Sequence, residues 1–169
     1  MTRLYKSDPG FEPPFDESIW ANQTKNPTNA QAAMHNDHCN LAFGWCAIQA
    51  FGDFDPHEGS HLILQQFGVV TEFPPGSTIL IPSSIVTHGN VPVHEHEQRS
   101  SLVHFSAGGL FRWVEYGFQT WESLKKSDPL RAACLWHERK TTRLPFALSL
   151  FFSKVDNLVD DHRAVFGDN

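Results

Sequence analysis

The sequence lacks the features of a secreted, membrane-spanning or strongly basic protein. No apolar run approaches the roughly 20 residues that cross a bilayer, and the first 20 residues carry no signal-peptide core. Lys and Arg number 13 against 19 Asp and Glu, and the formal net charge of -6 disfavours broad nonspecific binding of nucleic acid. We therefore expect an intracellular protein, cytoplasmic or nuclear, with no membrane partner. A nucleic-acid partner remains an alternative, because four basic residues near the C-terminal end could form a local patch: Arg131, Arg139, Lys140 and Arg143.

Cysteine is also scarce. The three cysteines, Cys39, Cys46 and Cys134, form an odd number and have no metal-finger spacing. Reduced thiols are the simplest interpretation, and they agree with an intracellular compartment. The sequence therefore predicts neither a disulfide framework nor a zinc finger.

Short apolar runs bounded by glycine and proline dominate the middle of the chain. We expect strands over residues 40–51, 61–64, 67–73, 78–82, 85–88 and 99–105, with a turn at Gly89-Asn90. Many short strands at this spacing are typical of an all-β sandwich or barrel. The 169 residues are enough for one domain with a sizeable core.

The pattern changes after Gly108-Gly109. Residues 110–127 and 128–139 carry apolar side chains at roughly helical spacing, and Pro129 stands at an expected helix start. The sequence therefore predicts a mainly β fold with flanking helices. We divide it into an irregular N-terminal arm of residues 1–30 and a single domain of residues 31–169, which includes the C-terminal helices.

Three residues suggest a metal site. His35 and Asp37 are two residues apart, so their side chains point to the same side of an extended strand. His88 follows 51 residues after Asp37. Two histidines and one carboxylate bind one face of an Fe(II) ion and leave its other positions open. The alternative is that these are unrelated polar residues in loops.

An arginine and a serine follow the last of these residues. Arg99 lies 11 residues after His88, and Ser101 shares its face of the strand. A planar guanidinium suits a carboxylate, so we expect this pair to hold the far carboxylate of 2-oxoglutarate. The alternative is a surface arginine paired with Glu95 or Glu97. Together the pieces suggest an oxygenase that uses Fe(II), 2-oxoglutarate and dioxygen.

A competing ligand set follows the predicted turn. His94 and His96 form a His-x-His pair like that of cupin metalloproteins, with Glu97 and His104 nearby. The stretch is dense with charge, and we interpret it as an exposed hairpin. A cupin-like metal enzyme remains the alternative.

Several motifs carry a family resemblance. They are GWCAI at 44–48, GDFDP at 52–56, HLIL at 61–64, EFPPGSTILIPS at 72–83 and AGGLFRWV at 107–114. In this order they resemble the fungal proteins of the TET/JBP branch of iron- and 2-oxoglutarate-dependent dioxygenases. The resemblance covers roughly residues 30–120.

The resemblance implies a double-stranded β-helix (jelly-roll) core. It assigns the metal to His35, Asp37 and His88 and the 2-oxoglutarate arginine to Arg99. It also implies oxidation of a methyl group on a nucleobase such as 5-methylcytosine. Two features depart from the family: only 34 residues precede His35, and Gly59-Ser60 stands where relatives have Gly-Gly. We expect the serine to alter only a loop.

Two further functions stay open. The same chemistry could act on a small-molecule metabolite, which the acidic charge and the compact length favour. A non-enzymatic or degenerate binding module of the same fold is the alternative from a different class. The presence of all three proposed ligands and of Arg99 speaks against degeneration.

Overall fold

The computed structural model describes residues 6–7, 10, 12, 14–16 and 18–151. The chain divides into two compact units, Met1–Phe118 and Gln119–Asn169. Every strand of the described residues belongs to the first unit.

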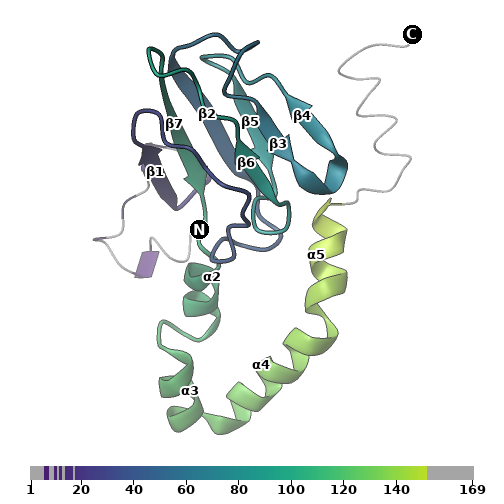
Figure 1. The fold of residues 1–169 in the computed structure, drawn as a ribbon. Helices are drawn as coiled ribbons and strands as arrows, with labels where there is room; N and C mark the ends of the chain where they lie inside the picture. Colours follow the sequence, from purple (N-terminus) through teal and green to yellow (C-terminus); the bar gives the residue numbers. More distant parts are fainter. Residues whose placement is uncertain (1–5, 8–9, 11, 13, 17, 152–169) are drawn as a thin grey trace, which may run out of the picture. The chain divides into compact units, whose positions relative to one another are not determined.

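Two antiparallel sheets form the first unit (Figure 1). The first sheet has the order β1-β7-β2-β5, with bounds Asn22–Asn26, Gln98–Phe105, Cys46–Asp53 and Thr78–Ile81. The second has the order β4-β3-β6, with bounds Val69–Thr71, Leu62–Leu64 and His88–Asn90. A short 3-10 helix, Gln65–Phe67, joins β3 to β4.

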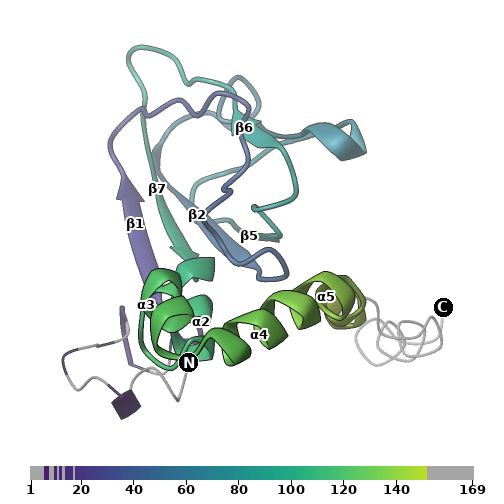
Figure 2. The same ribbon diagram turned by 90° about the horizontal axis from the view of Figure 1, so that it is seen from below.

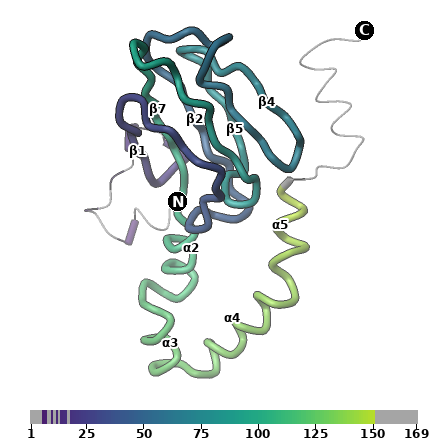
Figure 3. The backbone as a smooth tube through the Cα atoms, in the orientation of Figure 1, coloured from purple at the N-terminus to yellow at the C-terminus, as the bar shows by residue number. Residues whose placement is uncertain are grey.

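The chain winds between the two sheets. From β2 in the first sheet it passes to β3 and β4 in the second, and then to β5, β6 and β7 in alternate sheets. The tube in Figure 3 follows this winding, and Figure 2 shows the sheets on opposite sides of the unit. His35 adds an isolated bridge to His88 beside β6. This winding is a double-stranded β-helix, so the predicted mainly β fold with additional helices is confirmed.

The core lies between the sheets. Alternate residues of β2 point inward and are buried together with residues of neighbouring segments: Cys46, Ile48, Ala50, Phe54, Leu62, Phe73 and Ile81. On β7 the same alternation leaves Arg99 and Ser101 buried beside the partly buried Val103. One end of the apolar core is therefore polar, and the cavity described below opens there.

Several strand assignments differ from the sequence analysis. Residues 83–86 form a turn where part of a strand over 85–88 was expected, and β6 begins only at His88. The strand expected from residue 40 begins at Cys46.

The N-terminal arm was expected to be irregular through residue 30, but Asn22–Asn26 form β1 at the edge of the first sheet. Because an edge strand of polar residues has no apolar alternation, its pairing with β7 leaves no pattern in the sequence. Gly89-Asn90 is not a turn but part of β6. A Cβ atom on Gly89 would lie 2.8 Å from the Ala32 carbonyl oxygen, so glycine permits this close approach.

Helices follow β7. α2 (Gly108–Glu115) belongs to the first unit, and α3 (Trp121–Ser127), α4 (Pro129–Thr141) and α5 (Arg143–Phe151) form the second. Pro129 begins α4 as predicted, after an Asp128 carboxylate that accepts a hydrogen bond from the Arg131 amide. The sequence did not predict α5. None of the described helices has the length and apolarity to cross a membrane.

The predicted domain division, residues 1–30 and 31–169, stays a prediction. Its outer parts include residues 1–5 and 152–169, which lie outside the described residues.

Candidate functional site

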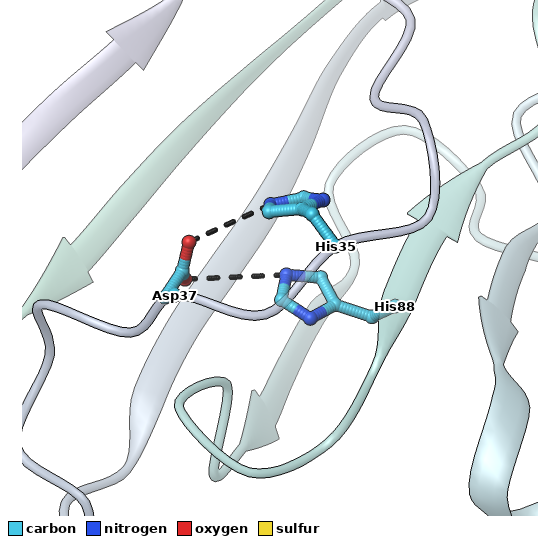
Figure 4. A group of neighbouring side chains, drawn as sticks. All are labelled: His35, Asp37 and His88. Carbon is cyan, nitrogen blue, oxygen red and sulfur yellow. Dashed lines mark ion pairs between the residues drawn. The ribbon is translucent and has the colours of Figure 1, made fainter.

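The fold brings the three predicted ligands together (Figure 4). His35 and His88 exchange two backbone hydrogen bonds of 2.9 Å, and the Asp37 amide donates to the Ser83 carbonyl oxygen at 3.0 Å. Nε2 of His35 lies 3.5 Å from Oδ1 of Asp37, and Nε2 of His88 lies 4.0 Å from Oδ2. One ligand atom from each residue falls within 4.8 Å of the others. The three side chains can therefore hold one metal ion.

The local backbone differs from the expected strand. His35 is a single bridge residue, and Asn36 and Asp37 belong to no strand. The His35–His88 bridge and the hydrogen bond to Ser83 take the place of a regular ladder in holding this segment. The side chains still converge, because each end of the His-x-Asp segment is tied to a different part of the chain.

Backbone carbonyl groups set the tautomer of both imidazoles. Nδ1 of His35 lies 2.8 Å from the Ala33 carbonyl oxygen, and Nδ1 of His88 lies 2.9 Å from that of Val86. A carbonyl oxygen only accepts, so each Nδ1 carries the proton and each neutral ring leaves the Nε2 lone pair free. Metal-binding histidines are commonly oriented in this way. The donor set therefore fits a metal ion, with both Nε2 atoms turned toward Asp37.

Asn40 orients the carboxylate of the candidate site. Its Nδ2 donates to Oδ2 of Asp37 at 3.2 Å and to Oγ of the buried Ser83 at 3.1 Å. The position of the carboxylate thus depends on two residues that sequence reasoning missed. Asn40 lies three residues after Asp37, but nothing in the spacing alone reveals that Ser83 completes the contact.

A cavity of about 330 Å³ joins the metal candidates to the other predicted site residues. His35, Asp37 and His88 line it together with Arg99 and Ser101. His88 is buried, Asp37 is half-buried and His35 is exposed, so solvent reaches the ligands from the side of His35. The structure therefore places all five predicted residues around one cavity.

Arg99 is a buried cation without a carboxylate partner in the described part of the chain. It is 5% exposed, and its Nε donates to Oγ of Ser60 at 2.7 Å. Burial lowers the pKa of the guanidinium, but arginine keeps its charge in proteins. The carboxylate of Glu97 instead accepts from the Asp55 and His94 amides at 2.6 and 2.8 Å. An anion in the cavity would supply the missing charge.

Ser101 has a partner on the edge strand. Its Oγ accepts a hydrogen bond from Nδ2 of Asn26 at 2.9 Å, and the two residues are register partners of β7 and β1. Asn26 and Thr24 also line the cavity. The edge strand is therefore part of the site, although no pattern in the sequence pointed to it.

The competing ligands do not form a metal site. His94 and His96 are exposed, and their rings stack with centroids 5.7 Å apart. His104 packs against the rings of Phe15 and Trp20 instead. Over the described residues, the group that brings three potential ligands together is His35, Asp37 and His88. His94, Glu95 and His96 are exposed as expected, whereas Glu97 is buried.

Comparisons with known proteins give fold neighbours. No protein-family model and no curated protein sequence matches the chain. Among solved structures the chain is similar to NgTET1 in complex with 5mC DNA, with a TM-score of 0.49 and 18% identity over 56% of this chain and 36% of that one. It is also similar to an RmlC-like cupin protein from Desulfovibrio desulfuricans, with a TM-score of 0.31 and 8% identity over 56% and 94% of the two chains. The chain thus spans little more than a third of the NgTET1 chain.

Proposed function

We propose that this protein is an Fe(II)- and 2-oxoglutarate-dependent dioxygenase that hydroxylates a C–H bond. One observation carries the proposal: the cavity holds a His-Asp-His group with free Nε2 atoms and also a buried arginine that lacks a carboxylate partner among the described residues. The His-Asp-His group suits a metal ion, and the buried arginine suits an organic acid bound in the same cavity.

His35, Asp37 and His88 would hold the iron. When bound, Fe(II) and 2-oxoglutarate would supply the oxidising chemistry: the reduction of dioxygen is coupled both to oxidation of the oxo acid to succinate and carbon dioxide and to oxidation of the substrate C–H bond to C–OH. The carbonyl groups of Ala33 and Val86 lie at the Nδ1 atoms, so the neutral form of each ring has its lone pair on Nε2. Asn40 holds one oxygen of Asp37 and leaves the other toward His35.

Arg99 and Ser101 would bind the far carboxylate of 2-oxoglutarate. The guanidinium supplies the charge and two N–H groups, and the Ser101 hydroxyl supplies one further donor. Apolar side chains from both sheets, Ile48, Leu62 and Val103, line the same cavity and limit the access of water to the carbon chain of the ligand. Arg99 and Ser101 both come from β7, which fixes their spacing.

For the substrate, the sequence resemblance favours the methyl group of a modified nucleobase such as 5-methylcytosine. A base in a duplex must be flipped out to reach such a cavity. A small-molecule metabolite is the second candidate, because the net charge of -6 does not favour a polyanion. Turnover of methylated oligonucleotides, with affinity that falls steeply with salt, would support the first candidate. Turnover of free compounds alone would support the second.

The first experiment is anaerobic addition of Fe(II) and then 2-oxoglutarate to metal-free protein. We expect stoichiometric iron and the weak visible charge-transfer band of the chelated cosubstrate. The band should disappear in His35→Ala and persist in His57→Ala, which removes an exposed imidazole paired with Glu72 outside the cavity. Failure of the wild-type protein to bind iron would contradict the proposal and favour a non-enzymatic binding module.

A further inference from the structure

Ser60 has an unusual backbone conformation for a serine. Its φ of +63° lies in the left-handed region, which residues with a Cβ atom adopt at an energetic cost. The residue is 0% exposed, so neither its backbone nor its hydroxyl is at the surface. Glycine would adopt this φ without the steric cost. The serine side chain is therefore kept at a position where the backbone favours glycine.

The hydroxyl contacts the arginine of the cavity. Oγ of Ser60 accepts the Nε–H of Arg99 at 2.7 Å across 39 residues of sequence. We expected a serine at this position to alter only a loop, whereas the structure connects it directly to the predicted cosubstrate-binding residue. The contact is buried, and a hydrogen bond from a charged donor in such surroundings is stronger than a neutral one.

We propose that Ser60 is a positioning residue that turns the Nη groups of Arg99 toward the bound carboxylate. The inference rests on the proposed function, because it assigns the geometry of 2-oxoglutarate binding. The Nε–H group donates to Ser60, and no described residue binds either Nη atom. Because Arg99 lines the cavity, its Nη groups are left for a ligand there.

This contact selects one of two ways in which arginine binds a carboxylate. A guanidinium can present Nε and one Nη group side-on, or both Nη groups end-on. Ser60 occupies Nε, which leaves the end-on mode for the ligand. The far carboxylate is then held along the direction of the Arg99 side chain, with Ser101 as a further donor on the same strand face. Ser60 thereby fixes the direction from which the bound carboxylate faces Arg99.

Two substitutions separate the hydroxyl from the backbone strain. Ser60→Ala removes the hydroxyl and keeps a Cβ atom at positive φ, whereas Ser60→Gly removes both. We expect both variants to bind 2-oxoglutarate roughly tenfold more weakly in anaerobic titrations of iron-loaded protein. Ser60→Gly should unfold at the same or a higher temperature than Ser60→Ala. The matched control is Ser100→Ala, between Arg99 and Ser101 but on the other strand face.

A second readout needs neither metal nor turnover. In metal-free protein, Nε–H of Arg99 should give a protected NMR signal that exchanges slowly with water, and Ser60→Gly should remove the protection. Equal 2-oxoglutarate affinity of wild-type and both Ser60 variants would overturn the positioning role, as would an unprotected Nε–H in the wild-type protein. A wild-type protein that binds iron but not 2-oxoglutarate would instead overturn the proposed function, and with it the ligand assigned to Arg99.

Discussion

Asn26 donates a hydrogen bond to Ser101 across 75 residues of sequence, with Nδ2 and Oγ 2.9 Å apart. Because the serine oxygen accepts this bond, its own proton is free to point to another acceptor. Both residues line the cavity, and the contact follows from the pairing of β1 with β7. The N-terminal edge strand therefore contributes to the site by orienting a side chain of the neighbouring strand.

This contact leads to a prediction for Asn26→Ala. The loss of the amide should weaken 2-oxoglutarate binding by a few-fold, because the Ser101 hydroxyl loses its orientation. If Asn26 acts through Ser101, the double variant with Ser101→Ala should bind as weakly as Ser101→Ala alone. Gln23→Ala, an exposed substitution on the same strand, is the control. Additive losses in the double variant would contradict the role.

Asp37→Ala should abolish stoichiometric iron binding and succinate formation. The carboxylate is the anionic member of the candidate site, and its removal leaves two imidazoles. Metal analysis after gel filtration and a succinate assay measure the two effects. Asp53→Ala removes an exposed carboxylate at the end of β2 and should change neither. Full turnover in Asp37→Ala would rule out His35, Asp37 and His88 as the metal site.

Arg99→Ala should mainly raise the KM for 2-oxoglutarate and leave iron binding intact. Arg99→Lys should restore little of the affinity, because an ammonium group cannot form the two parallel hydrogen bonds of a guanidinium. Steady-state kinetics at varied 2-oxoglutarate and metal analysis separate the two effects. An unchanged KM in Arg99→Ala would show that the carboxylate binds elsewhere.

The cysteines should differ in reactivity. Burial raises the pKa of the Cys46 thiol to about 11, whereas Cys39 and Cys134 are exposed. At pH 8 roughly one Cys46 in a thousand would be a thiolate, and the thiolate is the reactive form. Mass spectrometry should find a thiol reagent on Cys39 and Cys134 of the folded protein. Labelling of Cys46 should require denaturant, and rapid labelling without it would contradict its burial.

Glu97 should make stability depend on acidic pH. Backbone hydrogen bonds from Asp55 and His94 lower the pKa of its carboxyl below 4.5 in the folded protein. The stabilisation is therefore fully present above pH 4.5 and is lost as the pH falls through the lower, folded pKa. Glu97→Gln should lower the melting temperature at pH 7, and its difference from wild type should shrink in acid. An equal difference at pH 7 and pH 3 would contradict this.

The sequence predicted those features that depend on neighbouring residues or on the spacing of a motif. β3 and β5 are short, mostly apolar runs, and the spacing of His35, Asp37 and His88 was sufficient to propose the ligands. Whether they hold iron stays a prediction.

The contacts of Asn26 and Ser60 were beyond prediction, because each partner lies far away in the sequence and is brought close only by strand pairing and chain winding. A polar edge strand such as β1 also lacks the alternation that reveals a half-buried strand.

The backbone bridge between His35 and His88 has a consequence for folding. The two residues are 53 positions apart, and β2 to β5 lie between them, so the bridge closes a long loop. Such non-local pairings form slowly, since the entropy of closing the loop is lost before the contact is gained. The three ligands are adjacent only once this loop has closed. Uptake of a metal would then follow folding, and its rate would report completion of the β-helix.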